Sequence, residues 1–143
     1  MRSIITALLP LLLPPTFMAA LSHAHFVLQS PPSLGFTDTK EGQSPCGGFD
    51  IANRSTVTDF PVAGYPFYLL TTHTQSEFEY RAALLNDTAA WLDLIPPVLQ
   101  SSVGYFCLGA VSGISAWVGL DAVVQVKQSA PDGVLYQVSP GSN

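Results

Sequence analysis

Two histidines are the side chains of this sequence best suited to hold a metal ion, because one of them stands where a secreted chain would begin. Residues 1–24 have a positive start, an apolar run and then small residues, which is the pattern of a secretory signal peptide. Signal peptidase prefers small residues before its cut, and Ser22 and Ala24 satisfy that preference better than a site ending at Ala20. We therefore expect cleavage after Ala24, which makes His25 the first residue of the mature chain.

An N-terminal histidine offers two nitrogen ligands, its α-amino group and ring Nδ1. His73 lies in a loop between two expected strands and would supply a third nitrogen. Three nitrogens suit Cu(II) in tetragonal geometry, and the Irving–Williams order favours copper at such sites. The alternative is that His25 is an accident of cleavage and His73 an ordinary surface residue. The pattern predicts one copper ion, as Cu(II) or Cu(I), held by His25 and His73.

Composition excludes several classes of protein. The chain has 143 residues, of which 48% are hydrophobic and 10% charged, and its formal net charge is -5. So much apolar content with so little charge argues against a disordered chain. The acidic balance argues against nucleic acid as a partner, because phosphate binding needs clustered basic side chains. We expect one domain at residues 25–143, a monomer, which keeps all ten acidic residues but only four basic ones.

Nucleophilic or hydrolytic catalysis has little support in the sequence. It contains no G-x-S-x-G elbow, no phosphate-binding loop and no dinucleotide fingerprint. Glu77 and Glu79 form a carboxylate pair, but they alternate with Phe78 and Tyr80 along an expected strand. That alternation places them on the solvated face, which is their ordinary setting. No catalytic residue is assigned.

Secretion would also set the redox state and the surface chemistry of the chain. In an oxidising compartment Cys46 and Cys107 should form a disulfide, the alternative being two free buried thiols. The sequons Asn53-Arg-Ser55 and Asn86-Asp-Thr88 are candidate N-glycosylation sites and indicate surface loops.

Strand signals dominate, and no helical period is sustained. We expect strands near residues 25–29, 65–72, 77–84, 98–107, 122–127 and 134–138. Residues 33–64 read as a long loop, 73–76 as a hairpin-sized loop, 87–97 as the place for a short helical turn, and 130–133 as a hairpin turn. These features predict an all-β protein, an antiparallel immunoglobulin-like β-sandwich. The candidate core aromatic residues are Phe26, Phe36, Phe49, Phe67, Phe78, Trp91, Phe106 and Trp117.

Five motifs in a fixed order point to a family. They are His25-Phe-Val-Leu-Gln-Ser-Pro-Pro-Ser-Leu-Gly-Phe36, Pro45-Cys-Gly-Gly-Phe49, Thr71-Thr-His73-Thr, Tyr105-Phe-Cys-Leu108 and Pro131-Asp-Gly-Val-Leu-Tyr-Gln137. Over nearly all the mature chain, the sequence resembles the fungal X325 or Bim1-like copper-binding proteins, which are related to lytic polysaccharide monooxygenases.

The resemblance implies a monooxygenase-like, immunoglobulin-like sandwich. It implies that His25 and His73 form a histidine brace around one copper ion and that an Asp completes the site. Members of the family are not known for cleaving polysaccharides. The resemblance ties them instead to copper acquisition or homeostasis at the fungal cell surface, often through a glycolipid anchor.

The chain departs from the family in three places. Family members carry a Cys where this chain has Val138, so a family disulfide is missing or Cys46 and Cys107 pair differently. No carboxylate follows Cys107 where the family Asp is expected, which leaves Asp121 and Asp38 as candidates for the third ligand. The sequence ends at Asn143 with no signal for a glycolipid anchor. We therefore expect a freely secreted protein, or a gene model that is cut short.

Three functions remain in view. The first is a secreted, extracellular copper-binding protein that serves copper homeostasis at the cell surface, with a copper transporter or the cell wall as partner. The second is a copper monooxygenase acting on polysaccharide. The third is a non-catalytic wall or surface glycoprotein whose histidines are incidental.

Overall fold

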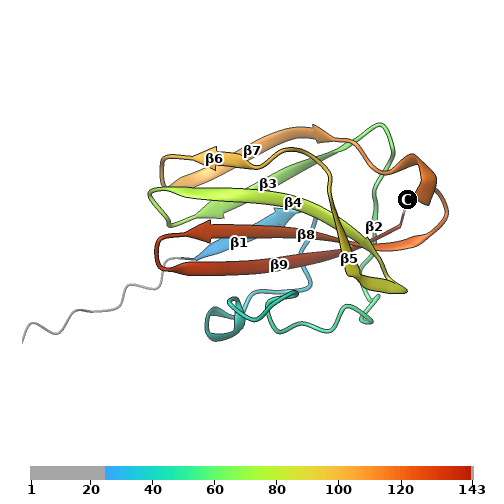
Figure 1. Ribbon diagram of the computed structural model, residues 1–143, viewed down its shortest axis with the longest axis horizontal. Coiled ribbons are helices and arrows are strands. Elements are labelled where there is room, and N and C mark those ends of the chain that lie inside the picture. Colours follow the sequence, from blue (N-terminus) through green and yellow to red (C-terminus); the bar gives the residue numbers. More distant parts are fainter. Residues whose placement is uncertain (1–24, 143) are drawn as a thin grey trace, which may run out of the picture.

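The computed structural model describes residues 25–142, so the expected signal peptide lies outside the described residues. The described chain forms nine β-strands and two short 3₁₀ turns, η1 (Asp38–Lys40) and η2 (Ser115–Trp117). None of it forms a helix that is long and apolar enough to cross a membrane. The strands build two layers (Figure 1), which confirms the predicted all-β sandwich.

One layer is a sheet of three antiparallel strands. In spatial order these are β1 (Phe26–Ser30), β3 (Tyr65–Thr71) and β7 (Gly104–Val111). β1 lies at an edge, with Phe26 opposite Thr71. Gly104 at the start of β7 pairs with the same Thr71, so β1 and β7 both begin where β3 ends.

The other layer has six strands. In spatial order these are β2 (Thr58–Asp59), β9 (Gly133–Ser142), β8 (Asp121–Ala130), β4 (Ser76–Leu84) and β5 (Asp87–Asp93), with β6 (Val98–Gln100) also paired to β4. β8 and β9 form the predicted hairpin, with Ala130 opposite Gly133. Residues 87–93 form a strand rather than the helical turn we expected, because they pair with β4.

The loop between β3 and β4 crosses from one sheet to the other. It carries His73 and is therefore not the hairpin loop that its length suggested. β4 alternates as predicted, with Phe78 and Tyr80 fully buried between the sheets and Glu77 and Glu79 partly exposed on the outer face. Because two sheets must pack face to face, a short crossing loop here brings strand ends of both layers together.

The main core lies between the sheets and is rich in aromatic rings. It consists of Phe26, Leu28, Phe60, Phe67, Leu69, Phe78, Tyr80, Val111, Val124 and Val126. Phe67 packs edge to face against Tyr80, with ring centroids 4.9 Å apart. Phe36, in contrast, is 43% exposed, so this predicted core residue lies at the surface.

A second, smaller core lies on the outer face of the six-stranded sheet. There Cys46 packs with Ala83, Val123 and Val138. The long segment before β2 covers this face, and Gly47 comes so close to β9 that an added Cβ would lie 2.3 Å from the carbonyl oxygen of Tyr136. Burial raises the pKa of the Cys46 thiol.

The predicted Cys46–Cys107 disulfide is not formed, and both cysteines are free. Cys107 is exposed on β7, which belongs to the three-stranded sheet, whereas Cys46 lies behind the six-stranded sheet. Two sheets therefore separate the thiols, a distance that a disulfide, with Cα atoms at most about 7 Å apart, does not span.

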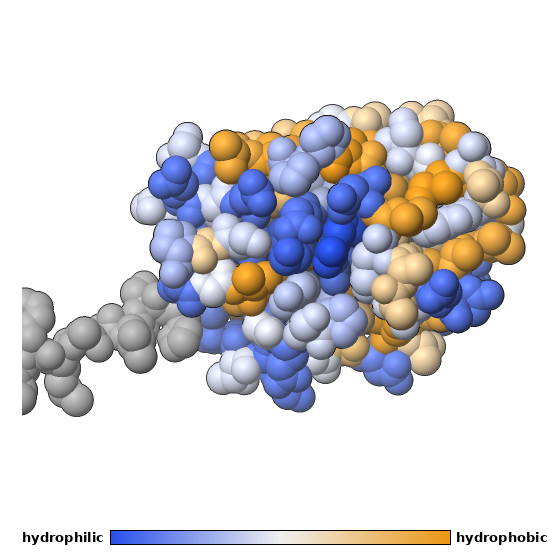
Figure 2. All heavy atoms as spheres, viewed as in Figure 1, coloured by the Kyte–Doolittle hydropathy of each residue, from blue (hydrophilic) through white to orange (hydrophobic). Residues whose placement is uncertain are grey.

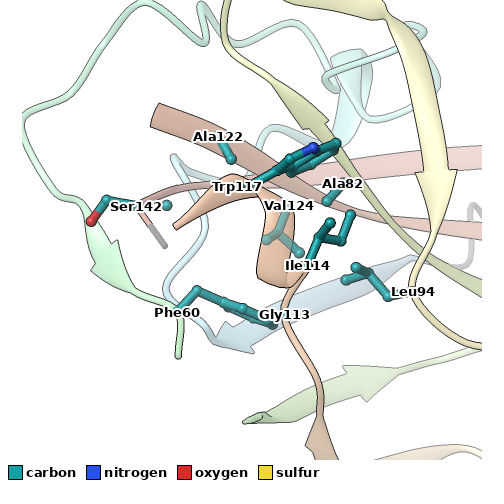
Figure 3. A pocket seen from close by; sticks show the side chains of 10 residues that line it. Phe60, Ala82, Leu94, Gly113, Ile114, Trp117, Ala122, Val124 and Ser142 are labelled. Carbon is teal, nitrogen blue, oxygen red and sulfur yellow. The ribbon is translucent and has the colours of Figure 1, made fainter. Parts of the chain in front are cut away.

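The two ends of the sandwich differ. The histidine end carries the start of β1, the β3–β4 loop and the β8–β9 turn, and it is at the left in Figure 1. The far end carries η2 and the β4–β5 turn. At the far end, apolar side chains line a small hollow, with Phe60, Ile114 and Trp117 among them (Figure 3). Apolar surface also gathers toward this end in Figure 2.

Candidate metal centre

His25 lies directly beside the β3–β4 loop. Its backbone nitrogen is 2.8 Å from Oγ1 of Thr72, and the backbone N–H of Thr72 donates to the carbonyl oxygen of His25 at 2.9 Å. These bonds extend the pairing of β1 with β3 by one residue. His25 is thereby fixed next to the residue that precedes His73.

Two carboxylates flank the His25 ring. Nδ1 is 3.1 Å from Oε2 of Glu41, and Nε2 is 2.9 Å from Oδ1 of Asp38. Glu41 is 2% exposed, whereas the side chain of Asp38 is 60% exposed. Phe36 touches the ring edge to face, at 5.8 Å between centroids. The ring is therefore held from several sides.

Glu41 belongs to the interior of the protein despite its charge. Its Oε1 accepts a hydrogen bond of 2.9 Å from Nε2 of Gln137, and the backbone N–H of Phe26 also donates to the carboxylate. Burial raises the pKa of Glu41, while the hydrogen bonds from Gln137 and His25 lower it and offset part of that effect.

His73 is 6% exposed and sits inside the crossing loop. Its backbone N–H donates to Oγ1 of Thr71, which also accepts from the buried amide of Gln128. On the ring, Nδ1 is 3.4 Å from Oδ1 of Asp132. Nε2 is buried and has no hydrogen-bond partner among the described residues. A buried polar atom without a partner is costly, and a metal ion would satisfy it.

Asp132 is the carboxylate that the sequence interpretation missed. It lies in the β8–β9 turn, within the tetrapeptide Ala130-Pro-Asp-Gly133 that we read only as a turn signal. It lines two neighbouring hollows, one shared with His25 and Asp38 and the other with Thr72 and His73. Asp132 thus stands between the two histidines. The available signal was the position of this turn at the end of a predicted hairpin.

The two predicted third ligands lie in different places. Asp38 is at the histidine end, against the His25 ring. Asp121 is at the far end: β8 pairs with β4 so that Ser129 lies opposite Glu77 and Ala122 opposite Leu84. Asp121 is bound there to Arg54 at 2.6 Å. Asp121 therefore does not share an end with His73, because β4 begins at the histidine end and pairs directly and antiparallel with β8.

The donor set of the histidine end fits copper in its chemistry. It offers two imidazoles, a backbone nitrogen that becomes an amine if the chain begins at His25, and the Asp132 carboxylate. Nitrogen donors with a carboxylate suit Cu(II). As they stand, no three His, Cys, Asp or Glu side chains of residues 25–142 are grouped closely enough to hold a metal by themselves. A backbone amine would therefore have to be one of the ligands.

Both sequon asparagines, Asn53 and Asn86, are exposed. Asn53 lies in the long segment before β2, where its Oδ1 accepts from the backbone N–H of Ser55 at 3.0 Å. Asn86 lies in the β4–β5 turn at the far end. Neither asparagine lies at the histidine end.

Comparison with known proteins gives two matches. A relative from Aspergillus fumigatus, described as an uncharacterized protein, is 31% identical over 122 residues, which cover 79% of this chain and 50% of that protein. The chain thus spans about half the length of this curated relative. The family model for copper acquisition factor BIM1-like matches residues 23–138. Since this match covers most of the chain, the protein belongs to the BIM1-like family of copper acquisition factors.

Proposed function

We propose that the mature protein begins at His25 and binds one copper ion as cargo at His25, His73 and Asp132. The observation that carries the proposal is the juxtaposition at the histidine end. The His25 backbone nitrogen is held beside Thr72, while the next residue, His73, keeps a buried ring nitrogen without a partner. The family name, a copper acquisition factor, supports copper as the metal.

The residues of the site have separate tasks in this proposal. His25 supplies its amine and ring, and His73 supplies its ring from a loop that Thr71 and Gln128 hold in place. Asp132 adds negative charge, which favours the doubly charged copper ion. Because the amine must lose a proton to bind metal, affinity rises with pH below the ordinary amine pKa of about 8.

We also propose that the protein is secreted and works outside the cell in copper acquisition or homeostasis. A start at His25 requires removal of residues 1–24, and that removal is what a secretory signal peptide undergoes. The exposed positions of Asn53 and Asn86 would admit glycans. A cell-surface copper transporter or the cell wall is the proposed partner.

The test is Cu(II) titration by calorimetry, with electron paramagnetic resonance on the same samples. Protein that begins at His25 should bind one ion per chain with nitrogen hyperfine structure. H25A and H73A should each weaken binding strongly, and one Ala added before His25 should do the same by displacing the amine. The matched control is D121N, which removes a carboxylate at the far end. Tight Cu(II) binding by the H25A/H73A double variant would overturn the proposal.

A further inference from the structure

On the edge of β1 that faces away from β3, one side chain, instead of a strand, forms hydrogen bonds with the backbone. Oε1 of Gln137 accepts from the backbone N–H of Leu28 at 2.9 Å, and Nε2 donates to the carbonyl oxygen of Phe26. Gln137 is 3% exposed and belongs to β9, in the other sheet. Its amide therefore makes the hydrogen bonds that a neighbouring strand would make. It also joins the two layers at the first residues of the mature chain.

The same amide is joined to the His25 ring through one further residue. Nε2 of Gln137 also donates to Oε1 of Glu41 at 2.9 Å, and Oε2 of Glu41 is 3.1 Å from Nδ1 of His25. The backbone N–H of Phe26 donates to the same carboxylate. Gln137 and Glu41 thus hold the start of β1 and the His25 ring in one connected set of hydrogen bonds.

Glu41 itself is fixed by its backbone on two sides. Its N–H donates to the carbonyl oxygen of Thr37 at 3.0 Å, and its carbonyl oxygen accepts from the N–H of Tyr136 at 2.9 Å. A buried carboxylate costs free energy unless several donors satisfy it. Here every named donor to the carboxylate comes from His25, from the residue after it, or from Gln137.

We propose that Gln137 is a positioning residue that sets the place of β1 and, through it, of the His25 backbone nitrogen. The proposal rests on the copper site proposed above, and it adds a residue that would not touch the metal. Glu41 is not such a residue, because it contacts Nδ1, the ring nitrogen that would bind copper. Outer residues that position a metal ligand change metal affinity by about 10–100-fold when they are altered.

The test compares buried glutamines on adjacent strands. Q137M and Q125M each remove a buried amide from the six-stranded sheet, but the side chain of Gln125 is hydrogen-bonded to Pro45 and Arg81 instead of β1. Both variants should lose stability. Only Q137M should shift the His25 imidazole resonances in metal-free protein, speed amide exchange at Leu28, and lower Cu(II) affinity by roughly 10–100-fold.

The two proposals fail in different ways. If the wild-type protein binds no copper, the copper site is wrong, while the metal-free His25 resonances and Leu28 exchange still test the positioning role. If copper binds and depends on His25 and His73, but Q137M behaves as Q125M does, the positioning role is wrong and the copper site stands.

Discussion

At the scale of single residues, Asp132 is the residue whose position in the structure differs most from the role that the sequence predicted for it. Its neighbours Pro131 and Gly133 explain its place in a turn, and a turn needs no other reason for an Asp. The structure adds that this turn meets His73, with 3.4 Å between Oδ1 and Nδ1. A residue that looked purely structural is thus a candidate ligand.

Asp132→Asn should lower Cu(II) affinity while leaving the fold intact, because the amide keeps the shape of the side chain but loses its negative charge. Calorimetry and thermal unfolding of the same protein measure both effects. Asp121→Asn is the control; it removes an exposed partner of Arg54, costs about 0–1 kcal/mol of stability, and should not change copper affinity. Equal affinity in the two variants would exclude Asp132 as a ligand.

The sequence could identify the two histidines but not their surroundings. The positions of His25 and His73 follow from a cleavage rule and from a loop between strands, which are local signals. Glu41 and Gln137 gave no such signal. Their roles depend on which strands become neighbours, and Gln137 contacts Phe26 and Leu28 across more than a hundred residues of chain.

At the scale of elements, the alternation of side chains and the turn residues predicted where the strands lie. They predicted less well which strands pair with one another. The β8–β9 hairpin and the inward side chains of β4 follow from local patterns. The crossing of the β3–β4 loop between sheets could not be predicted, because a four-residue loop serves a hairpin or a sandwich crossing equally well. The far-end position of Asp121 was missed for the same reason, since it depends on strand pairing.

The second core explains the unpaired Cys46. Val138 lies in contact with the same apolar cluster, at the position where the family resemblance predicts a Cys. The pairing expected with Cys107 arose only because no other cysteine exists in the chain. In this chain, therefore, apolar packing of Val138 and Cys46 joins the long segment to β9.

Val138→Cys should form a disulfide with Cys46 and stabilise the fold, by about 4.6 kcal/mol in the chain-entropy model for a loop of this length. Thiol titration of the oxidised, unfolded variant should find one free thiol, from Cys107. Chemical unfolding with and without reductant measures the gain. The C46A/V138C double variant should show no gain; a single variant that keeps three free thiols would contradict the expected pairing.

At the scale of the whole molecule, the core holds one ionisable group at its centre. Tyr80 is fully buried, and burial raises its pKa above the ordinary value. Above pH of about 10 the unfolded chain loses the phenol proton while the folded chain keeps it. The unfolded state then binds fewer protons, so stability falls as the pH rises, by up to about 1.4 kcal/mol per pH unit.

Tyr80→Phe should remove that part of the alkaline loss of stability. The measurement is the free energy of unfolding between pH 8 and about pH 11 for wild type and variant, since the other titrating groups are common to both. Tyr105→Phe is the control, because Tyr105 is 66% exposed and its ionisation should change the free energy of unfolding little. Parallel pH curves for wild type and Y80F would contradict the prediction.

The histidine end is assembled from parts of the chain that are made at different times. His25, His73 and Asp132 approach one another only when β1 has paired with β3 and the β8–β9 hairpin has closed, and such long-range pairing forms slowly. A nascent chain would therefore pass through most of its synthesis without the proposed site. Only a chain that has completed its folding would then bind copper at this site, and an ion encountered earlier would not be retained.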